Sequence, residues 1–531
     1  MVAMIVHHSS SPLFINLCPG CYHLWPCGGE GSSSSRVSGR RSWVQQHTWG
    51  GARRVKMGRR VCGGEEGGGV QGSGDAAVAM SLWYEGNSVR YGGVSGFVDQ
   101  QCGVLMSQQS EVHLDVHVRG PSMLVFSGGT AFNGVVEELK KWTTRVSHVL
   151  PVSDDGGSTA EIVRVVGGPA VGDIRSRCLR LSSDSSVEAL AVKRLLGHRL
   201  SSEETEAKAE WYEIVEGEHQ LWDNVSGPYR ETIRAFLVHF QCQILLRSVD
   251  KFSFRNGSIG NFFFAGARIF FQSLDAAIFL YSRVSHIPTH SLVLPAISTN
   301  DRLTLGCELL DGTVIKGQNA ISHPTVNDSM CRTSVVKTSS PLPSPIKRIF
   351  YMSSEGNNIF HEVFPAVNPA VVEQLSLVDA IVYGMGSLYT SICPSLVLRG
   401  VGETIAARSC LKVMILNSTY DRETFGMPAS AFVASITDAL NRTFCDSMES
   451  RNCDDPCPSL DHSPSDYITV MLVPEGGDIK IDVENLTRMG IARVVTVDST
   501  IDEKLGRIYE PKALIGALQV EIAMLHSHGS R

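Results

Sequence analysis

Short apolar runs that end in loops of small and acidic residues are the feature that most constrains the fold of this chain. The runs Met123–Phe126 and His148–Val152 are followed by Ser127-Gly-Gly-Thr130 and by Ser153-Asp-Asp-Gly-Gly-Ser158. Unbroken apolar runs are typical of strands that are covered on both faces, as in a parallel sheet with helices on each side. Because open parallel sheets bind ligands beyond the carboxyl ends of their strands, these loops are the first candidates for a binding site.

The chain after residue 119 alternates apolar runs with helical stretches. This alternation predicts an α/β fold, with a Rossmann-like parallel sheet flanked by helices, in a domain that spans residues 119–525. Helices are expected at Val135–Trp142 and Ser158–Val166, directly after the first two strands. Strands are expected at Leu124–Phe126, His148–Val152, Ser291–Ile297, Arg348–Met352, Ala380–Tyr383, Val413–Leu416, Ile468–Leu472 and Arg493–Val497.

Residues 1–118 differ from the rest in being rich in Gly and Ser. The first sixty residues hold eight Arg and Lys residues against a single acid, Glu30. A basic, Ser-rich and acid-poor leader is typical of an organelle transit peptide, and a disordered leader without an address is the alternative. Chloroplast and cytoplasm are therefore both left open as locations.

Two insertions are expected in the α/β domain. Residues 182–250 combine an acidic surface with apolar residues at helical spacing over Tyr229–Leu246, which predicts a helical insertion. Cys445–Ser465 is rich in Asp, Ser, Pro and Cys and is expected to be a mobile loop. The longest apolar stretch, Ile259–Val284, is interrupted by polar residues, so we expect a buried helix rather than a membrane span.

The composition excludes several classes of protein. A net charge of -7 argues against general nucleic-acid binding, although a local Gly-rich loop can still bind a small anion. Fourteen cysteines dispersed over 531 residues do not form a disulfide framework, which indicates a reducing compartment. No membrane partner is expected.

Acidic residues mark the candidate metal site. Asp154 and Asp155 follow a strand end, and two adjacent carboxylates are costly to hold together unless a cation or donors offset their repulsion. Mg²⁺ is commonly bound by one or two carboxylates together with substrate phosphates. The alternative is a turn in which Asp155 or Ser158 caps the following helix. Nearby, Arg175 is a candidate to bind a phosphate or to pair with Asp173.

Three further loops place small residues before a helix. Ser127–Gly134 has glycines but lacks both the Walker and the dinucleotide pattern. Arg255–Asn261 and Gly384–Ser391 put amide, hydroxyl and glycine residues at other helix starts, where free N–H groups can bind an anion or merely be capped. Asn417 and Asp421 follow another strand, and Tyr420 is a candidate to stack on a base.

These loops together resemble the 2-phospho-L-lactate transferase family, which also includes the bacterial gluconeogenesis factors. The resemblance extends from about Met123 to Asp498, and Phe254–Phe264 looks like the plant-type eukaryotic branch. It rests on Gly128-Gly-Thr130, Asp154-Asp-Gly-Gly-Ser158, Gly172-Asp-Ile-Arg175, Gly257-Ser-Ile-Gly-Asn261, Thr304-Leu, Glu308-Leu, Asp311-Gly312 and Gly386-Ser-Leu-Tyr-Thr-Ser391.

The resemblance implies a function and a site. Transferases of the family move a phospholactyl-type group from a guanylyl diphosphate donor to a deazaflavin-like alcohol, with Mg²⁺. Asp154 and Asp155 are implied as catalytic residues and, together with Asp173, as metal ligands. The residues implied to bind the nucleotide and its phosphates are Gly128, Gly129, Thr130, Arg175, Ser258, Gly260, Asn261, Gly386, Ser387 and Thr390.

Two departures from the family keep an alternative open. The family often has His where this chain has Gly257, and Pro where it has Met385. Loss of the His puts a proton-transfer role at that position in doubt. The alternative, implied by the other branch of the family, is a regulatory protein that binds a UDP-sugar or another nucleotide without catalysis. A nucleotide-linked small molecule is the expected partner in both cases, and the resemblance leaves a homodimer open.

Overall fold

The computed structural model describes residues 120–528 except for 130, 154–155, 248–250, 323–339, 354–360, 443–459 and 504. The chain divides into two units, Met1–Ser107 and Gln108–Arg531, and every described residue belongs to the second unit. The predicted leader and most of the predicted loop at Cys445–Ser465 therefore lie outside the described residues.

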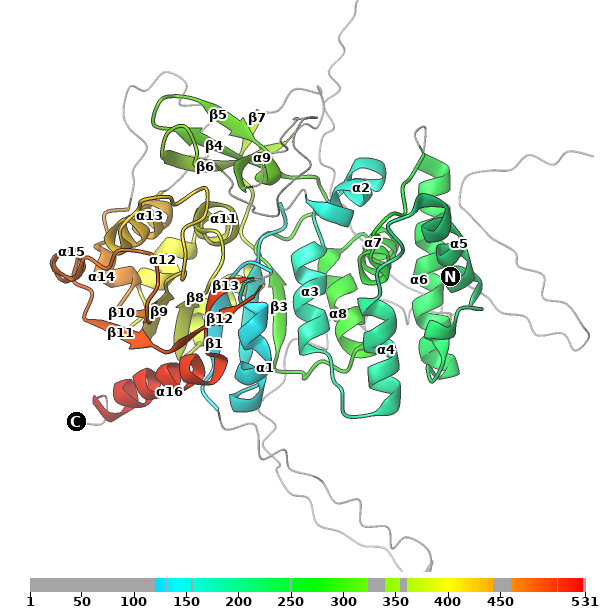
Figure 1. The fold of residues 1–531 in the computed structure, drawn as a ribbon, viewed down its shortest axis with the longest axis horizontal. Coiled ribbons are helices and arrows are strands. Elements are labelled where there is room, and N and C mark those ends of the chain that lie inside the picture. The colour runs from blue at the N-terminus through cyan, green and yellow to red at the C-terminus, as the bar shows by residue number, and fades with distance from the viewer. Residues whose placement is uncertain are drawn as a thin grey trace, which may run out of the picture. The chain divides into compact units, whose positions relative to one another are not determined.

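A seven-stranded parallel sheet lies at the centre of the described part of the chain (Figure 1). Each strand pairs in parallel with its neighbours. In spatial order the strands are β11 (Arg493–Val497), β10 (Val470–Pro474), β9 (Leu411–Ile415), β8 (Ala380–Tyr383), β1 (Met123–Phe126), β2 (Val146–Leu150) and β3 (Leu292–Pro295). The predicted α/β class is confirmed.

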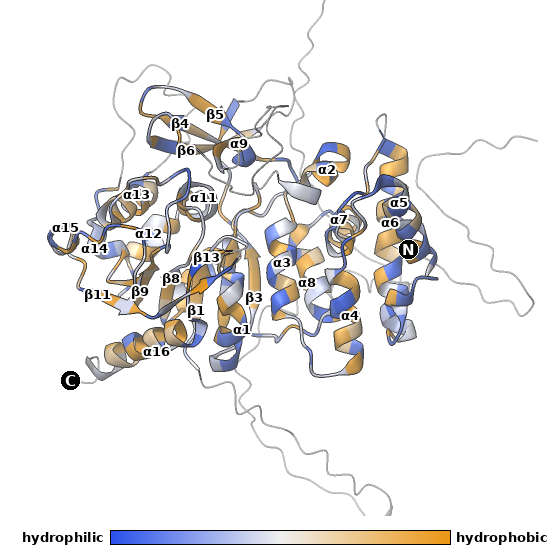
Figure 2. Ribbon diagram, in the orientation of Figure 1, coloured by the Kyte–Doolittle hydropathy of each residue, from blue (hydrophilic) through white to orange (hydrophobic). Residues whose placement is uncertain are grey.

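Burial explains why these segments are strands. Every residue of β1 and β8 is buried, and Figure 2 shows the central strands in the colour of hydrophobic residues. A strand that is covered on both faces has no solvent side, so its sequence is apolar at every position rather than at alternate ones. That is the pattern on which the prediction of a parallel sheet depends.

The order of the strands reverses beside β1. The chain proceeds from β1 to β2 and β3 on one side, whereas β8, β9, β10 and β11 continue on the other side. Connections that leave in opposite directions open a crevice at the carboxyl ends of the two strands involved, which is where sheets of this kind bind ligands. Here those strands are β1 and β8, and Gly128 and Gly386 follow them.

Helices flank the sheet (Figure 1). The helices predicted after the first two strands are present as α1 (Asn133–Trp142) and α2 (Gly157–Val166). The others are α3 (Gly172–Leu181), α4 (Val187–Gly197), α5 (Glu204–Glu216), the 3-10 helix η2 (Gln220–Trp222), α6 (Gly227–Arg247), α7 (Ile259–Phe271), α8 (Leu274–Val284), α9 (Gln318–Ser322), α10 (Pro369–Leu377), the π-helix η3 (Leu388–Ile392), α11 (Cys393–Leu396), α12 (Val401–Ala406), α13 (Ala429–Asn441), α14 (Pro464–Tyr467), α15 (Val483–Arg488) and α16 (Pro511–His528). In the described part of the chain, no helix combines the length and the apolar character needed to cross a membrane.

The long apolar stretch forms two helices rather than the single buried helix expected. α7 ends at Phe271, and the next residue, Gln272, has a left-handed φ of 52°. The Ser273 side chain then accepts a hydrogen bond from the Ala276 N–H to begin α8. α7 contacts both α6 and α8. The apolar content is therefore explained by a helix packed between two others.

A second sheet was not foreseen in the sequence. The strand predicted at Arg348–Met352 exists, but it belongs to a four-stranded antiparallel sheet of order β5-β4-β6-β7 and not to the parallel sheet. Its strands are β4 (Thr304–Leu309), β5 (Val314–Lys316), β6 (Ile346–Ser353) and β7 (His361–Val363), and a separate hairpin pairs β12 (Ser499–Asp502) with β13 (Gly506–Tyr509). The apolar run of β6 is compatible with either sheet, so the sheet to which it belongs is decided only by the strand with which it pairs.

Candidate functional site

A polar cavity of about 460 Å³ lies at the carboxyl ends of β1 and β8. Its walls are formed by the loops after β1 and β8 and by the starts of α2, α3 and α7. Helix α9, which follows β5 of the second sheet, also lines it. The predicted site residues that line it are Gly128, Gly129, Asp173, Arg175, Asn261, Gly386, Ser387 and Thr390. The cavity therefore brings together four of the loops singled out in the sequence.

The remaining predicted residues lie elsewhere or outside the description. Ser258 is fully buried and its hydroxyl has no hydrogen-bond partner among the described residues. Gly260 packs against the Leu196 carbonyl and the Arg175 side chain, behind the cavity wall. Thr130, Asp154 and Asp155 are not among the described residues.

Gly129 and Asp173 fit against each other. A Cβ atom on Gly129 would lie 1.9 Å from Oδ1 of Asp173, so no other residue fits there without moving the carboxylate. Asp173 stands in the first turn of α3, where the helix dipole favours a negative charge. The glycine thus allows a carboxylate to approach the backbone of the first loop.

Arg175 connects three elements around the cavity. Its Nε donates to Oδ1 of Asn261 at 3.0 Å, and the Asn261 amide donates to the Ser158 hydroxyl at 3.0 Å. Burial lowers the pKa of Arg175. The charge of Asp173 also acts favourably on this guanidinium, so binding a phosphate and pairing with Asp173 both stay predictions for Arg175.

Arg177 holds the loop after β1 through buried hydrogen bonds. It is fully buried and donates to the Gly128 carbonyl at 3.0 Å, to the Ser127 hydroxyl at 3.2 Å and to Oδ1 of Asn133 at 2.9 Å. Nδ1 of the buried His148 lies 2.9 Å from Arg177, and since a guanidinium only donates, this nitrogen is the acceptor. Burial lowers the pKa of Arg177 to about 10.

Two buried guanidinium groups therefore lie beside or beneath one cavity. Neither forms an ion pair with a carboxylate among the described residues, since both are hydrogen-bonded to neutral groups. The charge of Asp173 partly offsets the cost of burying these two cations, and an anion in the cavity would offset it further. The arrangement favours an anionic ligand.

A buried carboxylate that the sequence analysis missed stands behind the opposite wall. Glu423 is 5% exposed and accepts hydrogen bonds from the Ser322 hydroxyl at 2.5 Å and the Thr390 hydroxyl at 2.6 Å. The Tyr389 N–H donates to its other oxygen at 2.9 Å. Ser322 and Thr390 both line the cavity. Glu423 follows Asn417 and Asp421 after β9, but no local pattern distinguishes it from an exposed acid.

Two further cavities adjoin the polar one. A mainly apolar cavity of about 360 Å³ shares Ala131, Gly386 and Ser387 with it and is also lined by Met385, Asn417, Asp421 and the hairpin residues Leu505, Arg507, Ile508 and Tyr509. A cavity of about 320 Å³ shares Gly157, Ser158 and Arg199 and adds Arg255 and Gly257. Asn417 and Asp421 thus line a cavity beside the polar one, whereas Tyr420 lines none of these cavities.

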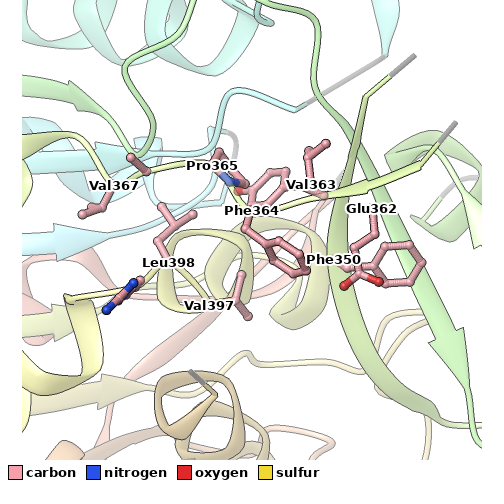
Figure 3. Close-up of a pocket in the computed structure, with 11 residues that line it drawn as sticks. Phe350, Glu362, Val363, Phe364, Pro365, Val367, Val397 and Leu398 are labelled. Atoms are coloured by element: carbon pink, nitrogen blue, oxygen red, sulfur yellow. The ribbon is translucent and has the colours of Figure 1, made fainter. Parts of the chain in front are cut away.

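A separate cavity of about 210 Å³ lies between the second sheet and the segment after α11 (Figure 3). Its wall is mostly apolar, with Phe350, Phe364, Val397 and Leu398 around Glu362. It contains none of the predicted site residues.

The described donors can be tested against a divalent cation. Among the described residues, no group of three His, Cys, Asp or Glu side chains is placed to hold a metal. The cavity nevertheless offers only oxygen and nitrogen donors without sulfur, with Asp173 as its carboxylate. Oxygen donors and a carboxylate, completed by ligand phosphates, fit Mg²⁺.

Gly257 has no room for the His that the family often carries there. A Cβ atom at this position would lie 2.8 Å from the Phe254 carbonyl oxygen and 2.4 Å from the Phe262 ring. The loop is therefore built around glycine, and an imidazole would require the backbone to move. No His lines the cavity in the described part of the chain.

Comparison with known proteins agrees with this architecture. The family model described as 2-phospho-L-lactate transferase CofD matches residues 123–510. An uncharacterized protein of Saccharomyces cerevisiae is 32% identical over 446 residues, which cover 73% of this chain and 98% of that protein. The gluconeogenesis factor of Bacillus subtilis is 24% identical over 372 residues, which cover 70% of this chain and 89% of that protein.

A solved structure shares the fold. A member of the UPF0052 family from Bacillus halodurans aligns with a TM-score of 0.50 at 20% sequence identity, over 75% of this chain and 99% of that chain. Fold and cavity together define an α/β protein with a polar cavity at the carboxyl edge of a parallel sheet. The chain belongs to the 2-phospho-L-lactate transferase (CofD) family.

Proposed function

We propose that this protein is a transferase that moves a substituted phosphate group from a nucleoside-diphosphate-linked donor to an alcohol. The observation that carries the proposal is a pair of buried guanidinium groups at a polar cavity: Arg175 lines it, and Arg177 binds the backbone of the Gly128 loop behind it. Phosphoryl transfer depends mainly on positioning and charge neutralisation, which such a site can supply.

The shape of the neighbouring cavities supports a nucleotide-linked donor. The pyrophosphate would occupy the polar cavity, and the apolar cavity that shares Gly386 and Ser387 would hold the nucleoside. The acceptor would approach from the cavity lined by Arg199 and Ser158. A guanine nucleotide and a deazaflavin-like alcohol are the ligands that the family membership favours.

The proposed step exchanges one phosphorus–oxygen bond for another. The acceptor oxygen attacks the phosphorus that bears the substituent, the bond to the bridging oxygen breaks, and the nucleoside monophosphate leaves with that oxygen. The acceptor's hydroxyl proton is released to a carboxylate or to solvent. Alignment of the two oxygens and stabilisation of the spread negative charge would provide most of the rate enhancement.

A divalent cation is part of the proposal. Asp173 would hold it together with Asp154, Asp155 and the phosphate oxygens of the donor. When bound, Mg²⁺ would neutralise charge on the phosphates. The residues of this chain would orient the donor through Gly129, Arg175 and Asn261 and keep it beside the acceptor.

A second candidate function is binding without catalysis. The observation that favours it is the glycine at position 257, where the backbone leaves no space for an imidazole. A regulator would bind a nucleotide-sugar in the same two cavities and turn nothing over.

A ligand screen distinguishes these functions. Thermal unfolding of the full chain would be measured with GDP, GTP, GDP-mannose, UDP-glucose and flavins, with and without Mg²⁺, since ligands of the native state raise its melting temperature. Asp155→Asn should abolish turnover while the nucleotide still binds. Binding of UDP-glucose without turnover in the wild type supports the regulator, and no stabilisation by any nucleotide contradicts both functions.

A further inference from the structure

Glu423 holds the hydroxyl hydrogens of two residues that face the cavity. The hydroxyls of Ser322 and Thr390 both lie within 2.6 Å of its Oε1, and the two hydroxyl oxygens lie 2.9 Å from each other. A hydroxyl carries a single hydrogen. When Glu423 is a carboxylate, both hydrogens point to it, and the two hydroxyls present only lone pairs to a ligand.

Protonation of Glu423 reverses this arrangement. The carboxylic acid donates a hydrogen bond to one hydroxyl, and that hydroxyl donates a hydrogen bond to the other. The hydrogen of the other hydroxyl is then free to point into the cavity. The same proton removes a negative charge from behind the wall. A phosphate-type anion gains a donor and loses a repulsive neighbour in this state.

We infer that the site binds the pyrophosphate of its ligand with Glu423 in the carboxylic acid form, so that binding takes up a proton and weakens as the pH rises. This inference rests on the proposed function, because it assumes that the cavity receives phosphates. Glu423 is then a positioning residue, which acts on the ligand through the hydroxyls of Ser322 and Thr390.

The surroundings of Glu423 place its titration in the relevant pH range. Burial, and then the charge of Asp421, raise the pKa of Glu423 to about 7, against the opposing effect of its three hydrogen-bond donors. Its ordinary value is 4.5. The carboxyl therefore exchanges its proton close to neutral pH.

Several other ionisable groups surround Glu423. Asp421 and Arg422 stand on its own loop, and Arg422 donates to the Ala320 carbonyl of α9. Burial raises the pKa of Cys307 on β4 to about 11 and that of Tyr389 on η3 to about 12. Burial likewise raises the pKa of Cys393 on α11 and that of Asp438 on α13, and the charges of Asp438 and Arg442 act on Cys393.

The test measures proton uptake on binding by the full chain. Isothermal titration with GDP-mannose and with UDP-glucose, whose pyrophosphates do not titrate between pH 6 and 8.5, would be run in buffers of different ionisation enthalpy. The affinity should fall about tenfold for each pH unit above the pKa of Glu423, and up to one proton should be taken up per ligand bound.

Substitutions assign the proton to Glu423. Glu423→Gln keeps the shape, accepts from the Tyr389 N–H and donates to both hydroxyls, so it imitates the acid form. Its affinity at pH 8.5 should equal that of the wild type at pH 6, without proton uptake. Asp438→Asn, which changes an acid on α13 that lines none of the three adjoining cavities, should leave the uptake unchanged.

The outcomes separate the two proposals. Tight binding that is independent of pH, or uptake that survives in Glu423→Gln, overturns the inference and leaves the proposed function standing. Failure of both nucleotide sugars to bind at any pH, when the screen with GDP and GTP also fails, overturns the proposed function and this inference with it.

Discussion

Arg177 donates a hydrogen bond from its guanidinium to the carbonyl oxygen of Gly128 at 3.0 Å, within a fully buried network. The first loop of the site is thus held by a cation inside the protein. The ring of Phe132 lies 5.2 Å from the guanidinium carbon and covers one face of it. The conformation of the loop and the positive charge beneath it depend on the same side chain.

Replacing Arg177 with Lys should destabilise the protein although the charge is retained. A single ammonium cannot reach the Gly128 carbonyl, Asn133, His148 and Ser127 together, and each buried partner left unsatisfied costs about 1–3 kcal/mol. The free energy of unfolding from urea denaturation should fall by roughly 2–4 kcal/mol. The exposed Arg180→Lys is the control and should change it by less than about 0.5 kcal/mol. Equal effects of the two substitutions would contradict the role assigned to the network.

His148 should make the protein sensitive to mild acid. Burial, and then the charge of Arg177, hold the pKa of His148 well below its ordinary value of 6.5. Below that pH the unfolded chain binds a proton that the folded protein does not, so stability falls as the pH falls, by up to about 1.4 kcal/mol per pH unit.

His148→Asn keeps an acceptor for Arg177 and removes the titration. The loss of stability between pH 6.5 and 5, measured by urea denaturation, should therefore be smaller in this variant than in the wild type. The exposed His290→Asn should retain the wild-type slope. An unchanged slope in His148→Asn would count against a neutral buried imidazole.

Asn261→Asp should weaken ligand binding without unfolding the protein. The new carboxylate would stand 3.0 Å from Nε of Arg175 and pair with it, and its other oxygen would accept from the Ser158 hydroxyl, to which the Asn261 amide now donates. Once Arg175 is neutralised, the affinity for GDP-mannose should drop at least about tenfold, or about 1.4 kcal/mol. Calorimetry measures the affinity, and a melting temperature at or above that of the wild type shows that the fold is intact. Undiminished affinity would mean that Arg175 does not face the phosphates.

Gly129→Ala should damage the site by steric overlap. The added methyl group would lie 1.9 Å from Oδ1 of Asp173, so either the loop or the start of α3 must shift, at a cost of about 1–3 kcal/mol. Gly516→Ala is the matched control, because this helical glycine has open space around it and alanine there should add up to about 1 kcal/mol. Opposite signs of the two changes in unfolding free energy are the expected result. A stabilising Gly129→Ala would show that the loop has more room than the structure gives it.

The sequence alone determined the fold class and most of the loops of the site. Unbroken apolar runs such as those of β1 and β8 occur where both faces of a strand are covered, and this depends on composition over four or five residues. Glycines and hydroxyl residues at strand ends identified Gly128, Gly129, Gly386 and Ser387 for the same local reason. Asp154, Asp155 and Thr130 stay predictions, because they lie outside the described residues.

Only the tertiary structure decided between alternatives that the local sequence patterns fit equally well. The apolar run of β6 suits either sheet, and its pairing with β4 is a contact between distant segments. Arg177 and Glu423 resemble any charged residue in the sequence, since burial and hydrogen-bond partners come from elements far along the chain. Asp173 and Arg175 in the cavity wall could be singled out from the sequence, whereas the buried charges of Arg177 and Glu423 behind the wall could not. The sequence specified the residues at the cavity edge, and three-dimensional packing specified the buried charges behind them.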